Sequence, residues 1–252
     1  MANPRKVQQR RGWAFGFCVA IVEPLLLLLT KRRWIDGEKI PAQGGVVLAS
    51  NHVSHVDPLM AAHLVYDHGR LPRYLAKSGL FKNRALAYFL TSAGQIPVER
   101  LTKSAAGAYD AAVAAVRHGE CVIVYPEGTL TRDPHLWPMT GKSGAARIAL
   151  ETGCPVVPVG HWGAQDLLPP YGRPDFFPRK HVTMKVGDPV DLSDLLAQPH
   201  SAALVQQATD RIMAALTDLV AEIRGETAPV ERFDPRKAGV RQIGNPKKKE
   251  RP

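Results

Sequence analysis

The chain has 252 residues, of which 45% are apolar and 22% are charged, so it can bury the core of one large α/β domain and is not a disordered chain. Three cysteines without a CxxC pair exclude a disulfide framework. The formal net charge of +10 at pH 7 suits three kinds of anionic partner: nucleic acid, a membrane surface, or an anionic substrate.

The excess charge lies at the two ends of the chain. Residues 1–33 hold seven basic residues and one acidic residue, a net of +6. Residues 224–252 hold nine basic and four acidic residues, a net of +5, whereas residues 34–223 sum to −1. A nucleic-acid-binding protein would need a basic face on its folded body. The distribution therefore favours contacts of the two ends with an anionic membrane surface and predicts no nucleic-acid partner.

The first predicted element is the apolar run from Trp13 to Thr30, in which Glu23 is the one charged residue and Pro24 follows it. The run is shorter than the about 20 residues of a spanning helix, and proline interrupts it. Basic pairs flank both ends. We predict that residues 1–35 form a helical hairpin that dips into one leaflet, which places the protein peripherally or monotopically at the cytoplasmic face of the cell membrane. The alternative is a buried core helix.

From about residue 44, short apolar runs alternate with longer helical patterns. This alternation predicts an α/β domain over residues 36–224, with a mostly parallel sheet flanked by helices and ligands bound beyond the carboxyl ends of the strands. Residues 225–252 are Pro- and Lys-rich and predict a basic, flexible tail. The predicted strands are Val46–Ala49, Arg73–Ala76, Gln95–Val98, Cys121–Tyr125, Val156–Gly160 and Val182–Val186; the predicted helices are Pro58–Asp67, Arg84–Thr91, Lys103–His118, Ser143–Thr152 and Ser201–Arg224.

The first candidate motif, Asn51–Pro58, joins a predicted strand to a predicted helix. His52 and Asp57 are five residues apart, and a loop that turns into a helix brings the carboxylate back to the imidazole. A carboxylate on one ring nitrogen leaves the other as a general base for a substrate hydroxyl. The alternative is that Asp57 only caps the helix and His52 is a polar loop residue. His55 is a second candidate, although it lies too near Asp57 for an easy dyad.

Two further motifs end predicted strands with polar residues. Gly94–Arg100 ends in Arg100, a side chain suited to a phosphate; the alternative is a surface ion pair. Pro126–Thr129 follows the strand at Val122–Tyr125. Here Gly128 permits a close backbone approach and Thr129 adds a hydroxyl, while Glu127 would repel a phosphate unless it is paired and is predicted to anchor a basic residue or a substrate hydroxyl. The alternative is a simple Pro-Gly turn.

A fourth motif, Gly141–Arg147, is not a phosphate-binding P-loop, because Leu136 occupies the place of the required first glycine. It predicts a helix start with Lys142 and Arg147 as cations for an anion. The last motif, Cys154–Val159, predicts a structural strand bounded by prolines.

The order and spacing of these blocks resemble the 1-acylglycerol-3-phosphate acyltransferases, whose signature is His, four residues, then Asp (the HX4D motif). The resemblance covers about residues 36–224, including Lys77-Ser78 and Leu80-Phe81. Two departures are Tyr125, where the family often has Phe, and Leu130-Thr131-Arg132, where it often has Arg-Ser. The second shifts a basic charge along the loop and leaves open whether Arg132 joins a phosphate site.

The resemblance implies an enzyme of phospholipid biosynthesis that moves a fatty acyl group from a thioester to a glycerol-phosphate hydroxyl. The donor would be acyl-CoA or acyl-carrier protein, and the acceptor lysophosphatidate or glycerol 3-phosphate, with neither cofactor nor metal. It also assigns roles: His52 as general base, Asp57 as its orienting partner, Arg100 on the phosphate with Glu127, Gly128 and Thr129 around it, and Lys77 as an additional cation. A thioesterase or lipase-like hydrolase is the alternative of another class.

Overall fold

Seven strands form one sheet in the order β1-β7-β6-β2-β5-β3-β4. The computed structural model describes residues 5–7, 9–77, 82–98, 105–199 and 201–241. All neighbouring strands are parallel except β6 and β7, which confirms the predicted class. The strands are β1 (Thr30–Ile35), β2 (Val46–Ser50), β3 (Pro72–Lys77), β4 (Ile96–Val98), β5 (Cys121–Val124), β6 (Val156–Trp162) and β7 (Lys180–Val186).

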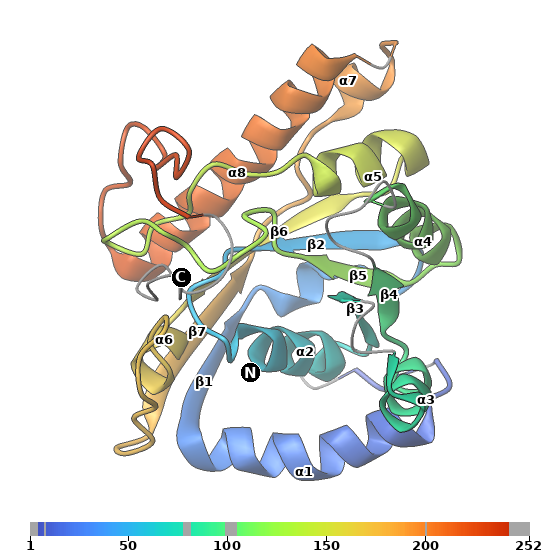
Figure 1. Cartoon of the computed structure of the whole chain (residues 1–252), viewed down its shortest axis with the longest axis vertical. Helices are drawn as coiled ribbons and strands as arrows, with labels where there is room; N and C mark the ends of the chain where they lie inside the picture. The colour runs from blue at the N-terminus through green and yellow to red at the C-terminus, as the bar shows by residue number, and fades with distance from the viewer. Residues whose placement is uncertain (1–4, 8, 78–81, 99–104, 200, 242–252) are drawn as a thin grey trace, which may run out of the picture.

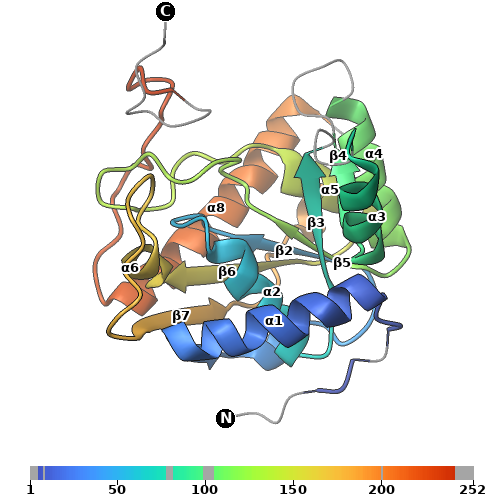
Figure 2. The same cartoon turned by 60° about the horizontal axis from the view of Figure 1, so that its bottom comes forward.

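Helices cover both faces of this sheet (Figure 1 and Figure 2). Helix α2 packs on one face with α1 beyond it, and α4, α5 and α8 pack on the other. The helices are α1 (Trp13–Leu29), α2 (Asp57–Asp67), α3 (Arg84–Ser92), α4 (Ala105–Arg117), α5 (Gly144–Thr152), α6 (Ala164–Leu167), α7 (Ser193–Leu196) and α8 (Ala202–Arg224), with a 3-10 turn at Gly37–Lys39.

The central strand β2 shows why its sequence is apolar at every position. Val46 and Leu48 point into the core beneath α2, whereas Val47 and Ala49 point into the core beneath α4, α5 and α8. Successive side chains of a strand alternate between its faces, and both faces are covered here. β2 is therefore anchored from both sides, and the loop that follows it starts from a fixed point.

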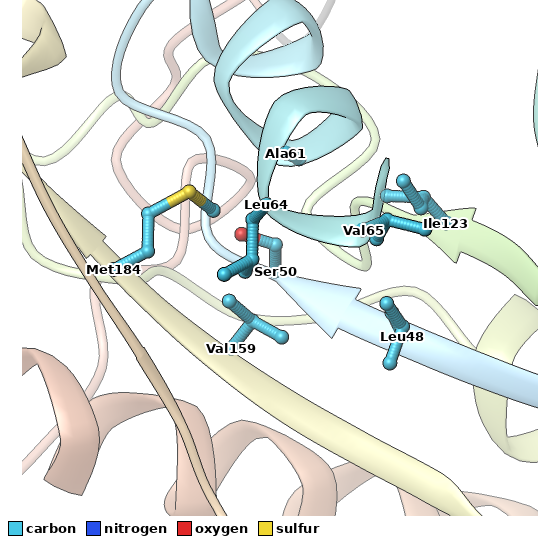
Figure 3. Close-up of a pocket in the computed structure, with 8 residues that line it drawn as sticks. All are labelled: Leu48, Ser50, Ala61, Leu64, Val65, Ile123, Val159 and Met184. Carbon is cyan, nitrogen blue, oxygen red and sulfur yellow. The ribbon is translucent and has the colours of Figure 1, made fainter. Parts of the chain in front are cut away.

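A small apolar cavity lies between α2 and the sheet (Figure 3). It has room for no more than about one water molecule, so it is a packing gap and not a lipid-binding tunnel. Its lining residues are Leu48, Ser50, Ala61, Leu64, Val65, Ile123, Val159 and Met184.

The N-terminal apolar segment differs from the predicted hairpin. It forms the single helix α1, which continues through Pro24, because a proline removes only one of the helix hydrogen bonds. Ala14, Phe15, Leu26 and Leu29 are its buried residues. Within the part of the chain that the structure describes, no helix is both long and apolar enough to cross a membrane.

Glu23, the charged residue of α1, is turned toward the body of the protein. Its Oε1 lies 3.6 Å from Nε2 of His63 on α2. His63 also contacts Asp67 and the Arg32 side chain of β1. Burial lowers the pKa of His63 despite the nearby carboxylates. One polar cluster thus ties α1 to α2 and β1.

The basic run after α1 was expected only to flank a membrane segment, yet it forms the edge strand β1. Lys31 and Arg33 are exposed, while Arg32 points inward to His63 and Asp67. Exposed cations on an edge strand discourage pairing with another chain, which explains how such a polar segment belongs to a sheet.

The predicted tail begins where α8 ends, at a left-handed Gly225. Its described part, residues 226–241, contains no helix or strand. The Thr140 backbone N–H nevertheless donates to the Phe233 carbonyl, and Arg232 lies 3.2 Å from Asp210. This part of the tail therefore lies against the body of the protein.

Candidate active site

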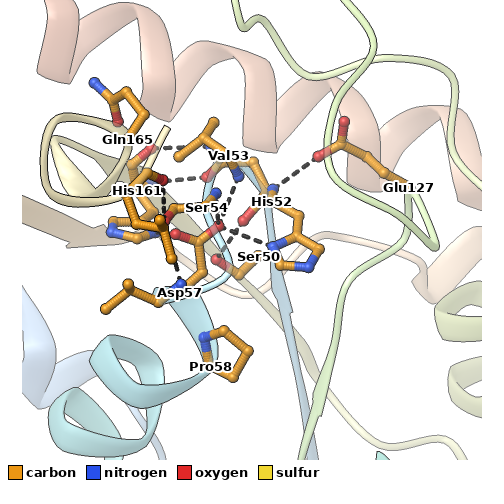
Figure 4. A network of polar contacts seen from close by, with 12 residues as sticks. Ser50, His52, Val53, Ser54, Asp57, Pro58, Glu127, His161 and Gln165 are labelled. Carbon is orange, nitrogen blue, oxygen red and sulfur yellow. Dashed lines mark hydrogen bonds and ion pairs between the residues drawn. The ribbon is translucent and has the colours of Figure 1, made fainter. Parts of the chain in front are cut away.

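The candidate site lies where three neighbouring parallel strands, β5, β2 and β6, reach their carboxyl ends. The loop after β2 carries the first sequence block, the loop after β5 carries the Pro-Glu-Gly-Thr block, and β6 ends beside them (Figure 4). Parallel strands place these ends at one edge of the sheet, as the sequence predicts.

The predicted dyad is formed. Nδ1 of His52 lies 2.9 Å from Oδ2 of Asp57, whose side chain is fully buried, while the His52 side chain is 16% exposed. Oδ2 also accepts the backbone N–H groups of Val53 and Ser54, at 2.6 and 2.8 Å. The Asp57 carboxylate therefore faces the preceding loop, and α2 begins without a side-chain cap, so the alternative that Asp57 only caps the helix is wrong. With its Nδ1–H donated to Asp57, neutral His52 has Nε2 as its basic nitrogen.

The Glu127 carboxylate braces the backbone of His52. Its Oε1 accepts the His52 N–H at 2.9 Å, and its Oε2 accepts the Met139 N–H at 3.1 Å. The side chain is almost fully buried, and burial raises its pKa to about 8, although the two backbone N–H groups work in the opposite direction. The partner that the sequence required for Glu127 is thus backbone rather than a cation.

The same loop fixes His52 in two further ways. The Thr131 N–H donates to the His52 carbonyl at 2.8 Å. The ring of Tyr125 stacks on the imidazole, with ring centroids 4.3 Å apart and an interplanar angle of 25°. The backbone on both sides of His52 and one face of its ring are therefore held by the segment 125–131, which leaves few orientations for the imidazole.

Two cations approach the exposed tip of this loop. Gly128 adopts a left-handed φ of +70°, and a Cβ built on it would come within 2.8 Å of Lys142 Nζ. Arg132 Nη2 lies 3.3 Å from the Thr129 hydroxyl, and its guanidinium covers the ring of Tyr171. Although the basic charge is shifted along the loop, Arg132 therefore still lies next to Thr129.

Two predicted cations stay predictions. Arg100 lies outside the described residues. Lys77 is the last residue of β3, in register with Val98 of β4, and its side chain lies outside the described part as well.

Two residues of the site were not anticipated. The Asn51 carboxamide bonds both backbone groups of His161, donating to its carbonyl at 2.9 Å and accepting its N–H at 2.8 Å. The His161 ring is fully buried, with Nδ1 3.3 Å from Oδ1 of Asp57. The signal was available, since His161 follows the Val-Pro strand at the same edge of the sheet.

Comparison with known proteins places the site in context. A sequence profile described as Acyltransferase matches residues 32–162, slightly more than half of the chain. The chain is 26% identical over 204 residues to the 1-acyl-sn-glycerol-3-phosphate acyltransferase of Bacillus subtilis, covering 79% of this chain and 94% of that protein. It is 32% identical over 125 residues to the enzyme of the same name from Borreliella burgdorferi, covering 48% and 47% of the two chains.

A solved structure has the same fold. The 1-acyl-sn-glycerophosphate (LPA) acyltransferase PlsC from Thermotoga maritima superposes with a TM-score of 0.63 at 22% sequence identity. The superposition covers 87% of this chain and 83% of that one. The matched profile spans β1 to β6 and contains His52, Asp57 and the whole segment 125–131.

Proposed function

The chain belongs to the acyltransferase family, and on this premise we propose that it transfers a fatty acyl group to the free hydroxyl of 1-acylglycerol 3-phosphate, giving phosphatidic acid. The observation that supports this best is the His52–Asp57 dyad, held at the sheet edge by the Pro-Glu-Gly-Thr loop. The names of the relatives supply the acceptor. Glycerol 3-phosphate is the alternative acceptor.

In the proposed reaction, Nε2 of His52 removes the proton from the acceptor hydroxyl as its oxygen attacks the thioester carbonyl. Asp57 holds the imidazole in the required tautomer and stabilises the imidazolium that forms. The tetrahedral intermediate then collapses and expels the thiolate, which takes the proton from His52. The products are the ester and a free thiol, with no change in oxidation state.

Direct transfer requires no acyl-enzyme, and the nearby serines fit that mechanism. The Ser54 hydroxyl donates to the Leu168 carbonyl at 2.7 Å, and the Ser50 hydroxyl donates to the Asn51 carbonyl at 3.3 Å. A nucleophilic serine would instead donate to the histidine. These contacts favour a transferase over a lipase-like hydrolase.

For the acceptor phosphate we propose the exposed tip of the loop at Gly128 and Thr129. A glycine lets a ligand approach the backbone closely, and Lys142 and Arg132 bring positive charge to the same place. Arg100 and Lys77 remain proposed phosphate cations on the ground of the family resemblance. Glu127 acts there through the backbone, because both its oxygens accept N–H groups.

The test is an assay of the full chain in detergent with acyl-CoA or acyl-carrier protein as donor, each crossed with lysophosphatidate, glycerol 3-phosphate, or no acceptor. We expect phosphatidic acid by mass spectrometry, formed only when lysophosphatidate is present. Release of free fatty acid at the same rate without an acceptor would support the hydrolase and refute the proposal. The donor that gives turnover decides between CoA and carrier protein.

We also propose that α1 rests on the membrane that holds the acceptor. Residues spaced by four or three along one face of α1 are each 49–58% exposed: Trp13, Phe17, Ile21, Leu25 and Leu28. A continuous apolar stripe of this kind marks an interaction surface. Exposed Arg10 and Arg11 precede it and exposed Lys31 and Arg33 follow it, which suits anionic lipid.

A further inference from the structure

The two oxygens of the Asp57 carboxylate have very different surroundings. Oδ2 accepts three N–H groups, from the His52 ring and from the backbone of Val53 and Ser54. Oδ1 is buried and accepts no hydrogen bond from the described residues. A buried carboxylate oxygen without a donor is costly, and the nearest candidate donor is the ring of His161, 3.3 Å away.

His161 is itself a buried polar group without a hydrogen bond. Its side chain is fully buried, and neither ring nitrogen bonds to another described residue. Nδ1 faces the carboxylate at a distance that a small rotation of the ring would shorten to a hydrogen bond. Figure 4 shows the ring next to Asp57, with His52 on the other side of the network.

The proton of a neutral His161 has two places to go, and they are unequal. On Nε2 it would be a buried donor without an acceptor among the described residues, whereas on Nδ1 it meets the charged Oδ1. A buried N–H without an acceptor on Nε2 costs free energy, and the Nδ1–H tautomer avoids that cost because its N–H faces Oδ1. The Nδ1–H tautomer is therefore favoured.

We propose that His161 is a positioning residue for the acyl transfer: its Nδ1–H donates to Oδ1 of Asp57, so that one carboxylate is shared by two histidines, the base His52 and the buried His161. This inference rests on the proposed function, because it assigns His161 to the dyad that performs it. The donor shares the charge of Asp57 and fixes the carboxylate plane, which aims Oδ2 at His52. His161 does not touch the substrate, since it is fully buried.

The charged surroundings agree with a neutral His161. Burial lowers its pKa, the positive charge of a protonated His52 lowers it further, and Asp57 works in the opposite direction. Among the described residues, Glu127, Tyr125 and Tyr74 also interact with Asp57, whereas the charges that act on His161 are those of Asp57 and His52. A lowered pKa favours the neutral ring, as the proposed donor role requires.

The backbone holds the ring in place. The Asn51 side chain bonds the backbone N–H and carbonyl of His161. The residue before His52 in the sequence therefore fixes the backbone of His161, which faces Asp57. Gly163, two residues on, has a φ of +102°, and a Cβ there would come within 2.0 Å of the His181 carbonyl. The backbone on both sides of the His161 ring is therefore closely packed.

The test compares pH profiles of turnover for three variants in detergent. His161→Leu removes the donor at similar volume, His161→Asn keeps an N–H near the place of Nδ1, and His161→Gln places it near Nε2 instead. Without the donor, the unshared charge of Asp57 holds the proton of His52 more tightly. For His161→Leu we expect the acid limb of the pH profile of turnover to move up by about one pH unit, with about tenfold lower turnover on that limb. His161→Gln should behave in the same way. Asn should keep the wild-type limb.

A merely structural role would lower the amount of active protein in all three variants without moving the limb, and that result would overturn the proposal. So would an unchanged profile for Leu. If Leu does not fold, the comparison of Asn with Gln decides, since equal profiles for these two contradict a donor at Nδ1.

A second readout does not depend on turnover. In the ¹⁵N-histidine spectrum of the full chain, the His161 signal, assigned by its loss in His161→Asn, should show the neutral Nδ1–H form from pH 6 to 9. An Nε2–H form, or titration in that range, would refute the inference. Absence of any transfer by the wild type would refute the proposed function while leaving this spectral result to stand alone.

Discussion

The catalytic edge of the sheet and the helix α1 are built in opposite ways. At the edge, polar side chains are buried: Asn51, Ser54, Asp57, Glu127, Thr131 and His161 are each at most 4% exposed. All of these side chains except that of His161 bond to backbone groups. In α1, apolar side chains are exposed, and Glu23, the polar one, is turned inward. One region hides its polar groups and the other displays its apolar groups.

This difference indicates what each region contacts: the polar side chains of the edge contact groups within the chain, and the exposed apolar side chains of α1 face outward. Among the described residues, the buried polar network around His52 is complete apart from the His161 ring, Asp57 Oδ1 and the Tyr125 hydroxyl, so most of its geometry is set before any substrate arrives. On α1, Trp13 and Phe17 contact rings of α3, but about half of each side chain of the stripe stays exposed, and a lipid surface would cover it. Damage at the edge should therefore affect the chemistry, and damage to α1 should affect attachment.

The largest effect should follow from His52→Ala. We expect about 10²–10⁴-fold lower turnover, because the general base is lost, with little change in the melting temperature. His118→Ala is the matched control, an exposed histidine at the end of α4. Near-normal turnover of purified His52→Ala would remove His52 from the mechanism.

The second prediction concerns attachment alone. In the double variant Ile21→Glu, Leu25→Glu, two charges stand on the exposed face of α1, and we expect binding to anionic vesicles to fall about 10–100-fold. Turnover in detergent, with acceptor dispersed in micelles, should stay near that of the wild type. Vesicle sedimentation and the detergent assay measure the two quantities separately.

The control for this variant is Leu196→Glu. Leu196 is 42% exposed on α7, which lies far from α1 in Figure 1. If Leu196→Glu weakens vesicle binding as much as the α1 variant does, the division between the two regions is wrong.

The sequence could predict the catalytic edge because its chemistry is local. His52 and Asp57 meet across five residues, and alternating strands and helices place the loop after β5 at the same edge. The contact of His161 with Asp57 could not be predicted from the sequence, because the two residues are 104 positions apart along the chain. It forms because β6 lies next to β2 in the sheet.

The N-terminal region could not be predicted as well, because its structure depends on long-range contacts and not on local sequence. An apolar run with a proline suits a hairpin and a single helix equally, and tertiary contacts decide. Glu23 reaches His63, and the run of basic residues pairs with β7 as an edge strand. These contacts join residues far apart in the sequence, so no local pattern predicts them.

The third prediction uses the raised pKa of Glu127. The folded protein holds this proton up to about pH 8, whereas an unfolded glutamate releases it near pH 4.5, so folding takes up a proton between these values. This group therefore makes the free energy of unfolding fall as pH rises through that window. Glu127→Gln should remove this slope, measured by chemical denaturation at pH 5, 6.5 and 8.

The same variant leaves one backbone N–H facing an amide N–H₂, which costs about 1–3 kcal/mol at pH 5. The deficit relative to wild type should narrow toward pH 8, where the wild-type carboxylate becomes charged. A deficit that is constant from pH 5 to 8 would show that Glu127 does not titrate in this window.

The smallest effect should come from Lys31→Gln, which tests whether charge assists the apolar face of α1. A basic residue near an anionic lipid surface contributes about 1 kcal/mol, so binding to anionic vesicles should weaken about fivefold at low salt. Zwitterionic vesicles are the internal control, because a cation gains little there and the variant should bind them as the wild type does. Salt near 1 M shortens the screening length to about 3 Å, so at that salt the wild type and the variant should bind anionic vesicles equally. If the variant loses binding to both kinds of vesicle equally, Lys31 serves the fold of β1 and not the membrane, and attachment rests on the apolar stripe of α1 alone.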